Sequence, residues 1–456
     1  MGPSIIFTND PEVAGQSVAE PSIPRSWLIS ATIKPLTDNL DLVSLEGEEW
    51  KTWRARFNPS FSNRNVLALV PGMIKDVQVF IDLFRKRTGT GGGWGGVFPL
   101  EDLTTNLTID VIGRAVLDIE LNEQTAGPSR FKKHFLDQIS RFLLVRNIVT
   151  IWQWYSPWRL SAIARNARVM HSELLPSIER CLRQTKTQKS SGKTIIDLAM
   201  RPITRATDEE KAPVTDQLFV NTVISQLKLF MFAGHDTTAT ALCWVLHCIA
   251  KNPEVARKLR AEHDKILGED PAMAAETLKE SPHLLNSLLY TGGILKEALR
   301  LYPGPISMRD GRPHYNILDK ETGDRYPTDG FIIWDGMRSR SRSEELWPRA
   351  QEIVPERWMT TDESNPLYPK KHSWRMFGVG ARNCIGQELA VMEMKIVLVF
   401  MAREIELDCA WDEWDAKNNH SGPGPVVEGD RCYQINKGTP HINDGMPVHV
   451  RLWQKA

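Results

Sequence analysis

The sequence predicts a mainly α-helical protein with small β-sheets. Apolar residues recur with helical periodicity over residues 77–87, 103–117, 131–144 and 164–185. A longer periodic segment covers residues 215–250; as one helix, at about 1.5 Å per residue, it would span about 50 Å, enough to cross a whole domain. Strand patterns are few and short, at residues 5–7, 326–333 and 448–452.

Turn and loop signals separate these elements. Residues 9–11, Asn-Asp-Pro, close the first strand. A glycine cluster at residues 89–96 and a polar stretch at residues 185–194 predict surface loops between helices. Asp329 and Gly330 lie within the strand pattern of residues 326–333.

The long segment has the signals of a central helix. Thr215 is a suitable N-cap, and residues 229–234 are apolar on every face, which predicts burial. A second helix follows at once, because Asn252 supplies an N-cap, Pro253 suits the first helical position and Gly268 ends the pattern.

The composition excludes several classes of protein. The 456 residues include 56 Lys and Arg against 56 Asp and Glu, and this balance removes the electrostatic case for a nucleic-acid binder. With 25% charged residues and a mean hydropathy of −0.31, we expect a water-soluble globular protein rather than a membrane bundle. The first residues lack a basic stretch followed by a long apolar run, so neither a signal peptide nor a membrane span is predicted. The length allows two or three domains or one large one.

The cysteines predict no structural framework. No two of them form a CxxC pair, so neither a disulfide scaffold nor a structural zinc site is expected. The six are Cys181, Cys243, Cys248, Cys384, Cys409 and Cys432.

The most specific segment is the glycine-rich loop 377–386, FGVGARNCIG, which presents Cys384 just before a helical pattern. A cysteine at a helix N-terminus faces unpaired N–H groups and the positive end of the helix dipole, which predicts a lowered thiol pKa. Gly378 and Gly386 allow tight turns and let a flat cofactor approach the backbone. Arg382 is a permanent cation suited to a carboxylate. The alternative is a buried, inert cysteine beside a turn.

Three further segments carry polar residues whose presence in a predicted helix or loop suggests a specific role. Glu297 and Arg300 stand three residues apart on one predicted helix face, where an ordinary solvated ion pair is the alternative. Arg357 follows in the segment PERW, before the cysteine loop. Asp236 and Thr237 lie in AGHDTT, in the middle of the long apolar helix, although Gly, Asp and Thr are poor helix formers. The alternative for this segment is a back-bonded threonine pair and a partly solvated Asp at a bend in the helix.

Taken together and in this order, these segments resemble the cytochrome P450 family of haem-thiolate monooxygenases. The loop meets the family pattern FxxGxRxCxG in full. The resemblance implies haem b as the cofactor, with the Cys384 thiolate as the axial ligand that favours O–O cleavage. It assigns Phe377, Gly378, Arg382 and Gly386 to haem binding as well.

The resemblance assigns roles to the other segments. Asp236 and Thr237 would relay protons, while Glu297, Arg300 and Arg357 would form a buried structural network that holds the cysteine loop.

Three further residues are assigned to the haem propionates. Trp50 and Arg54 fit the family's WxxxR element, for which an amphipathic helix with a snorkelling arginine is the alternative. Arg309 is a further expected propionate contact.

The implied activity is hydroxylation, epoxidation or another oxidation of a lipophilic small molecule, with O2 and two electrons from NADPH–cytochrome P450 reductase. A basic stretch before the loop would steer an acidic reductase, or would be an ordinary solvated loop; it contains Lys370, Lys371, His372 and Arg375. The expected pocket draws on residues 26–45, 230–233, 305–308 and 433–440, in which Phe230, Ile306 and Met308 suggest a lipophilic guest. Residues 47–62 resemble fungal members, many of which act in secondary-metabolite biosynthesis.

The resemblance implies one domain over residues 1–456. The family places a membrane anchor, a proline-rich hinge, a first helix and a first strand before the point where this chain begins, so we expect these elements to be absent. Eukaryotic members are usually anchored to the endoplasmic reticulum, facing the cytoplasm, and membrane association stays open. Two alternative functions also stay open: a reductase-independent haem-thiolate isomerase or dehydratase, whose relatives lack the acid–alcohol pair, and an inactive truncated haem-binding form.

Overall fold

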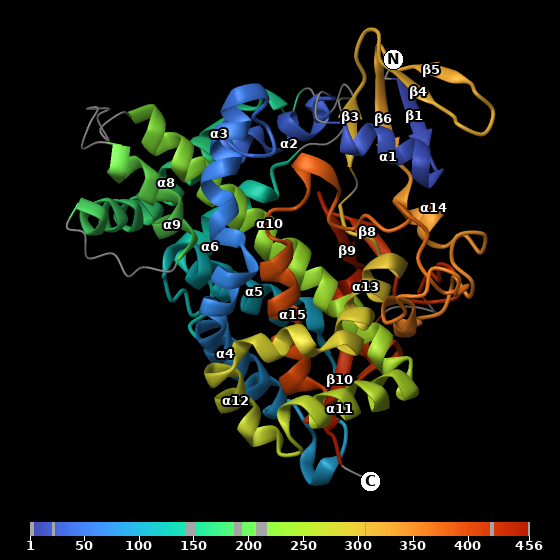
Figure 1. The fold of residues 1–456 in the computed structure, drawn as a ribbon. Coiled ribbons are helices and arrows are strands. Elements are labelled where there is room, and N and C mark those ends of the chain that lie inside the picture. The colour runs from blue at the N-terminus through green and yellow to red at the C-terminus, as the bar shows by residue number, and fades with distance from the viewer. Residues whose placement is uncertain are drawn as a thin grey trace.

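The structure is a computed structural model that describes residues 4–20, 23–142, 152, 154–186, 194–206, 217–305, 307–419 and 424–454. It confirms the mainly helical fold with small sheets. Helix α10 (Gln217–Ala250) runs through the centre, and three-stranded sheet β1-β6-β3 lies at one corner, at the upper right of Figure 1. Within the described residues, we find no helix that combines the length and the apolar character needed to cross a membrane.

Helix α10 organises the helical core. Residues 222–231 and 238–248 are buried, as an all-round apolar helix requires. Helix α5 (Leu100–Leu117) packs along it so closely that a Cβ at Gly234 would lie 2.7 Å from Ile112 Cδ1. The predicted N-cap, Thr215, lies outside the described residues.

The other helices agree with most predicted ranges. Residues 103–117 fall within α5 and residues 164–185 within α8 (Pro157–Lys186). Of the predicted range 77–87, residues 77–85 form the last part of α4 (Asn63–Arg85), and α6 (Arg130–Ile139) is shorter than predicted. Further helices are α1 (Pro11–Ala19), α2 (Trp27–Thr37), α3 (Gly47–Phe57), α9 (Ile195–Ala206), α11 (Pro253–Leu267), α12 (Ala274–Glu280), α13 (Leu289–Leu301), α14 (Met337–Ser341), α15 (Gln387–Met401) and α16 (Trp411–Lys417).

Helix α11 follows α10 as the proline predicts. Pro253 is its first residue, and Gly268, with φ +88°, ends it. Asn252 does not cap α11 with its side chain, because its Nδ2 donates to the carbonyl oxygen of Cys248 at 2.7 Å, at the end of α10.

The strands of the described residues form four small sheets. In the first, β6 (Phe331–Asp335) pairs in parallel with β1 (Ser4–Thr8) and antiparallel with β3 (Met308–Asp310). In the second, β10 (Pro447–Leu452) lies between β2 (Phe98–Pro99) and β7 (Ile405–Cys409). The others are the hairpins β4–β5 (Asn316–Leu318, Arg325–Pro327) and β8–β9 (Gln434–Asn436, Pro440–Ile442).

The predictions of strands 5–7 and 448–452 are confirmed, but the single strand at residues 326–333 is wrong. Two strands, β5 and β6, occupy this region in different sheets. Gly330 has a φ of +77°, which interrupts the extended chain between them.

We predict that two neighbouring glycines of α13 respond in opposite ways to alanine. A Cβ at Gly293 would lie 2.6 Å from the carbonyl oxygen of Pro355, whereas a Cβ at Gly292 would meet nothing closer than Lys395 Cε at 3.8 Å. Gly293→Ala should lower the free energy of unfolding by about 1–3 kcal/mol through overpacking. Gly292→Ala, the matched control, should raise it by up to about 1 kcal/mol through helix propensity. Chemical denaturation followed by tryptophan fluorescence measures both, and equal effects would contradict the close approach.

Candidate functional site

The loop before α15 is shaped by glycine. Gly378 and Gly380 have φ values of +70° and +72°, a region that costs other residues energy. The N–H of Cys384 donates to the carbonyl oxygen of Phe377 at 2.7 Å, which closes the loop. Gly386 and the first turn of α15 follow, and α15 packs against α10 in the centre of the molecule (Figure 1).

The exposure of Cys384 sets it apart from the other cysteines. Its side chain is exposed, that of Cys409 is half-buried, and the other four are buried. Protein atoms nevertheless enclose Cys384, and this burial raises the pKa of its thiol, against the N–H groups of Gly386 and Gln387 and the guanidinium of Arg54, which act to lower it. The predicted net lowering is therefore wrong, because desolvation outweighs the helix N-terminus. Cys384 is therefore the most accessible thiol of the six.

The middle of α10 is open on one face. Between its buried stretches Ala233 is exposed, and Thr237, one turn later on the same face, is half-buried. Thr237 Oγ1 donates to the carbonyl oxygen of Ala233 at 2.7 Å, which is the back-bonded geometry considered from the sequence. His235 is buried, with Nδ1 2.8 Å from the carbonyl oxygen of Met231, and no group of metal-ligating side chains occurs among the described residues.

Asp236 makes its contacts with the β8–β9 hairpin. Its Oδ1 lies 3.3 Å from His441 Nε2, and Thr439 Oγ1 donates to its Oδ2. Burial acts to raise the pKa of Asp236, but the hydrogen bond from His441 and nearby positive charge leave it below its ordinary value. Sequence reasoning missed His441, since no local motif marks a histidine that only strand pairing brings to this helix.

Arginine side chains gather beside the cysteine loop. Arg54 donates to the backbone oxygen of Asn383 at 2.8 Å and to its Oδ1 at 2.7 Å. Arg382 is buried, pairs with Glu46, and has its guanidinium carbon 4.0 Å from the centre of the Trp50 ring.

Arg25 and Arg309 complete this arginine cluster. They pair through an isolated β-bridge, and Arg25 donates to the carbonyl oxygen of Arg382 at 3.2 Å. Burial, assisted by repulsion between the guanidinium groups, lowers the pKa values of Arg309 and Arg382 to about 10. Sequence reasoning missed Arg25, which is a lone basic residue without a motif. A cluster with more cations than nearby carboxylates, beside an exposed sulfur, fits a flat group with acidic substituents.

Glu297, Arg300 and Arg357 form a fully buried network, so a solvated surface pair is excluded. The Glu297 carboxylate accepts hydrogen bonds from Arg300 at 2.8 and 2.9 Å and from Arg357 at 3.3 Å. It also accepts from Trp358 Nε1 at 3.1 Å and from the N–H of Val354 at 2.9 Å.

Aromatic rings connect this network to the cysteine loop. Ring centres lie 5.5 Å apart for Trp358 and Trp374, and 6.1 Å apart for Trp374 and Phe377. Trp374 Nε1 also donates to the carbonyl oxygen of Lys296, next to Glu297, at 3.1 Å. The network and the loop therefore share a continuous packed support.

The predicted basic surface before the loop is smaller than expected. Arg375 is buried, where it pairs with Asp335 at 3.0 Å and donates to the carbonyl oxygen of Pro11. The prediction that Arg375 belongs to the basic surface was wrong, because the local sequence does not reveal that a buried carboxylate of β6 pairs with it. Lys370 and Lys371 are exposed.

Of the three residues expected to make the pocket lipophilic, one is buried in the core, one is half-buried and one is not described. Phe230 is buried in the core, edge-on to Phe57 at 4.8 Å and to Phe61 at 5.2 Å, so it packs helices together. Met308 is half-buried in β3, and Ile306 lies outside the described residues.

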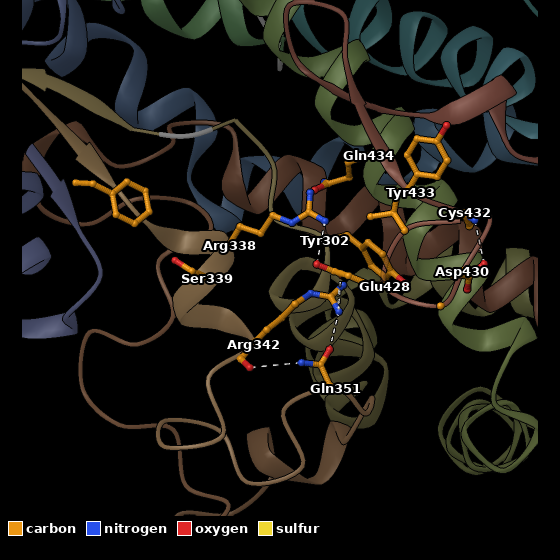
Figure 2. A pocket seen from close by; sticks show the side chains of 13 residues that line it. Tyr302, Arg338, Ser339, Arg342, Gln351, Glu428, Asp430, Cys432, Tyr433 and Gln434 are labelled. Carbon is orange, nitrogen blue, oxygen red and sulfur yellow. Dashed lines mark hydrogen bonds and ion pairs between the residues drawn. The ribbon is translucent and has the colours of Figure 1, made fainter. Parts of the chain in front are cut away.

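A separate cleft lies between α14 and the chain before β8. Its volume is about 810 Å³, and Figure 2 shows Arg338 and Arg342 directed toward Glu428, at 3.4 and 3.1 Å. Neither Cys384 nor Thr237 is among the described residues that line this cleft. This cleft is therefore separate from the surroundings of Cys384 and Thr237.

The comparisons with known proteins agree with this geometry. A family model described as cytochrome P450 matches residues 18–423. Cytochrome P450 monooxygenase polC of Polytolypa hystricis is 37% identical over 459 residues, covering 99% of this chain and 80% of that protein. Cytochrome P450 monooxygenase acrF of Aspergillus aculeatus is 29% identical, covering 97% of this chain and 90% of that protein. A crystal structure of a cytochrome P450, CYP102L1, has a TM-score of 0.74 at 19% identity, over 98% of this chain and 89% of that one, which shows the same fold.

We predict that Glu297→Ala strongly destabilises the protein. The substitution leaves two buried guanidinium groups without their carboxylate, so the free energy of unfolding should fall by about 3–5 kcal/mol. Glu254→Ala is the matched control, because it removes an exposed carboxylate that pairs with Arg257 at the same i, i+3 spacing. That change should leave the free energy of unfolding nearly unchanged, because an exposed ion pair contributes little. Urea denaturation of both variants checks this, and a loss for Glu297→Ala no larger than that of the control would contradict a structural role.

Proposed function

The chain belongs to the cytochrome P450 family, and from that premise we propose that it is a monooxygenase whose haem iron is bound by the Cys384 thiolate. Members of this family bind haem through a cysteine thiolate. The observation that carries the choice of Cys384 is its exposed thiol, in the loop just before the N-terminus of α15. Cys409 is the less suitable candidate: burial raises the pKa of its thiol to about 12, and its Sγ lies 3.5 Å from His247 Nδ1.

The arginine cluster is suited to the two haem propionates. Arg25, Arg54, Arg309 and Arg382 bring surplus positive charge to the cysteine loop. The buried Nε of Arg54 has no hydrogen-bond partner among the described residues, so it is available to an anion. Trp50 packs under Arg382 and holds its guanidinium plane.

The backbone of the cysteine loop leaves room for a flat group. Phe377 and the glycines Gly378 and Gly386 would form the surface that contacts one haem face, and a Cβ at Gly386 would come within 4.0 Å of the Cys384 sulfur. Glu297, Arg300 and Arg357 would hold this loop in place through Trp358 and Trp374, which pack next to Phe377. When bound, the haem supplies the activation of dioxygen and the transfer of one oxygen atom to the substrate.

Asp236 and Thr237 would move protons between two sides of α10. Thr237 lies on the open face, with its hydroxyl anchored to the carbonyl oxygen of Ala233. Asp236 contacts the β8–β9 hairpin and remains ionised through its contact with His441. A carboxylate beside a hydroxyl can pass protons toward the open face as they are consumed there.

The substrate would be a lipophilic small molecule, and we propose secondary-metabolite biosynthesis as the setting, from the resemblance of residues 47–62 to fungal members of the family. The family generally uses a redox partner, and we propose NADPH–cytochrome P450 reductase as the electron donor. We also propose that residues 1–456 act as one domain. The acid–alcohol pair favours this function over a reductase-independent isomerase or dehydratase.

We predict that Cys384→Ser abolishes the thiolate-type absorption spectrum of the reduced, carbon-monoxide-bound protein. Serine removes the sulfur that the assignment needs while preserving the size of the side chain. Cys409→Ser is the control and should retain the thiolate-type spectrum. Loss of that spectrum in Cys409→Ser, with retention in Cys384→Ser, would overturn the assignment.

We predict that Thr237→Ala separates electron use from product formation. The variant should bind haem and substrate, but the product formed per NADPH should fall about 10-fold or more, with hydrogen peroxide released instead, because proton delivery is lost. Thr222→Ala is the matched control, since Thr222 back-bonds to Leu218 at 2.8 Å in the same helix. Full coupling in Thr237→Ala would remove the proposed relay.

A further inference from the structure

His441 lies between two carboxylates that come from different helices. Its Nε2 is 3.3 Å from Asp236 Oδ1 on α10, and its Nδ1 is 2.8 Å from Glu101 Oε1 in the first turn of α5. The side chains are largely buried, with exposed fractions of 16% for His441, 13% for Asp236 and 11% for Glu101. Each ring nitrogen of the imidazole therefore has a carboxylate partner of its own.

The β8–β9 hairpin delivers two side chains to this place. Ile435 pairs with His441, and Asn436 with Pro440, which fixes the register of the hairpin. Thr439 and His441 are two residues apart and so point to the same side of the strand. Thr439 Oγ1 donates to Asp236 Oδ2 and lies 3.0 Å from His441 Nε2. Both oxygens of the Asp236 carboxylate are thereby held by the β8–β9 hairpin.

We propose that His441 is a positioning residue for proton delivery: it joins Asp236 to Glu101, directs the Asp236 carboxylate, and sets the pH at which that carboxylate takes up a proton. This inference rests on the proposed function of Asp236 and Thr237. The role is indirect, because His441 acts through Asp236 rather than on the substrate or the haem.

The charges around His441 support the positive form of its ring. Burial acts to lower the pKa of His441, but the hydrogen bonds to Asp236 and Glu101 outweigh it and raise the pKa to about 9. Glu101 stands in the first turn of α5, where the helix dipole favours a carboxylate. His235 on α10 is the other histidine near Asp236: burial lowers the pKa of His235 itself, while its charge adds to that of His441 in lowering the pKa of Asp236.

The other charged groups near His441, Asp236 and Glu101 act on a neighbouring carboxylate, Asp102. Asp102 follows Glu101 on α5, and burial together with the Glu101 charge raises its pKa. Lys132 of α6 and Lys437 of the hairpin turn act on Asp102 in the opposite direction. The two carboxylates that bind the ring are thus the charges that govern His441.

The sign of the pH dependence follows from these shifts. The stabilisation contributed by His441 is full below its ordinary pKa of about 6.5 and is lost as the pH rises through about 9. Without His441, the pKa of Asp236 rises, because burial then acts with less opposition. Proton delivery in such a variant should therefore change at a higher pH than in the wild type.

The first arm of the test measures the ring itself. Histidine ¹³Cε1 signals of the holoprotein are titrated by NMR in the diamagnetic, reduced carbon-monoxide complex, and His441→Gln assigns the signal. We expect the His441 midpoint above pH 8, and we expect Glu101→Gln to lower it by at least about one pH unit. A midpoint at or below 6.5, or one that Glu101→Gln leaves unchanged, would overturn the proposal.

The second arm measures product formed per NADPH as a function of pH. His441→Gln should shift the acidic limb of this profile upward by at least half a pH unit. His449→Gln is the matched control, because His449 also pairs with a glutamate, Glu413 at 3.1 Å, but on β10 and away from Asp236. It should leave the profile unchanged, whereas a His441→Gln profile that overlays that of the wild type would reject the positioning role.

The two arms also separate this proposal from the function on which it rests. Should Thr237→Ala remain fully coupled, the relay itself fails, while the NMR titration still decides whether His441 is held by Glu101. Should Thr237→Ala lose coupling and His441 titrate like an ordinary histidine, the relay stands and the role of His441 falls. A poorly folded His441→Gln would not block the test, because the wild type and Glu101→Gln carry the titration.

Discussion

Surplus positive charge beside the cysteine loop is the constraint on which the proposed site depends. Arg25, Arg54, Arg309 and Arg382 come from four distant parts of the chain and converge where Glu46 pairs with one of them. Burying positive charge is costly, and the lowered pKa values of Arg309 and Arg382 express that cost. An anionic cofactor would neutralise this excess positive charge. The cluster therefore indicates where the propionates would lie, with the Cys384 sulfur and the open face of α10 flanking the haem.

The rest of the structure keeps this region rigid. Positive φ values at Gly378 and Gly380 shape the loop, and the Glu297 network supports it through Trp358, Trp374 and Phe377. Helix α10 has one open face, where Ala233 is exposed and Thr237 half-buried. The site is thus assembled from backbone conformation and buried hydrogen bonds that leave little freedom to its side chains.

The sequence was sufficient for features that depend on local pattern. The long apolar helix, the proline-initiated α11, the terminal strands and the spacing of the cysteine loop all follow from neighbouring residues. The predictions from sequence failed where long-range contacts determine the surroundings of a side chain. Arg375 is buried because Asp335 of β6 pairs with it, Phe230 packs against α3 and the turn that follows it, and burial reverses the expected shift in the Cys384 pKa. Arg25 and His441 carry no local signal, and only the folded chain brings them to the arginine cluster and to Asp236.

The most direct test of the central claim compares two forms of the cofactor. Apoprotein is titrated with haemin and with haemin dimethyl ester, whose propionates carry no charge, and the dissociation constants are measured from the absorption spectra. Loss of two charge-assisted contacts, at roughly 1.5–3 kcal/mol each, predicts an affinity for the ester on the order of 100-fold weaker or more. Equal affinities for the two forms would contradict the claim that the arginine cluster binds the propionates and places the haem beside Cys384.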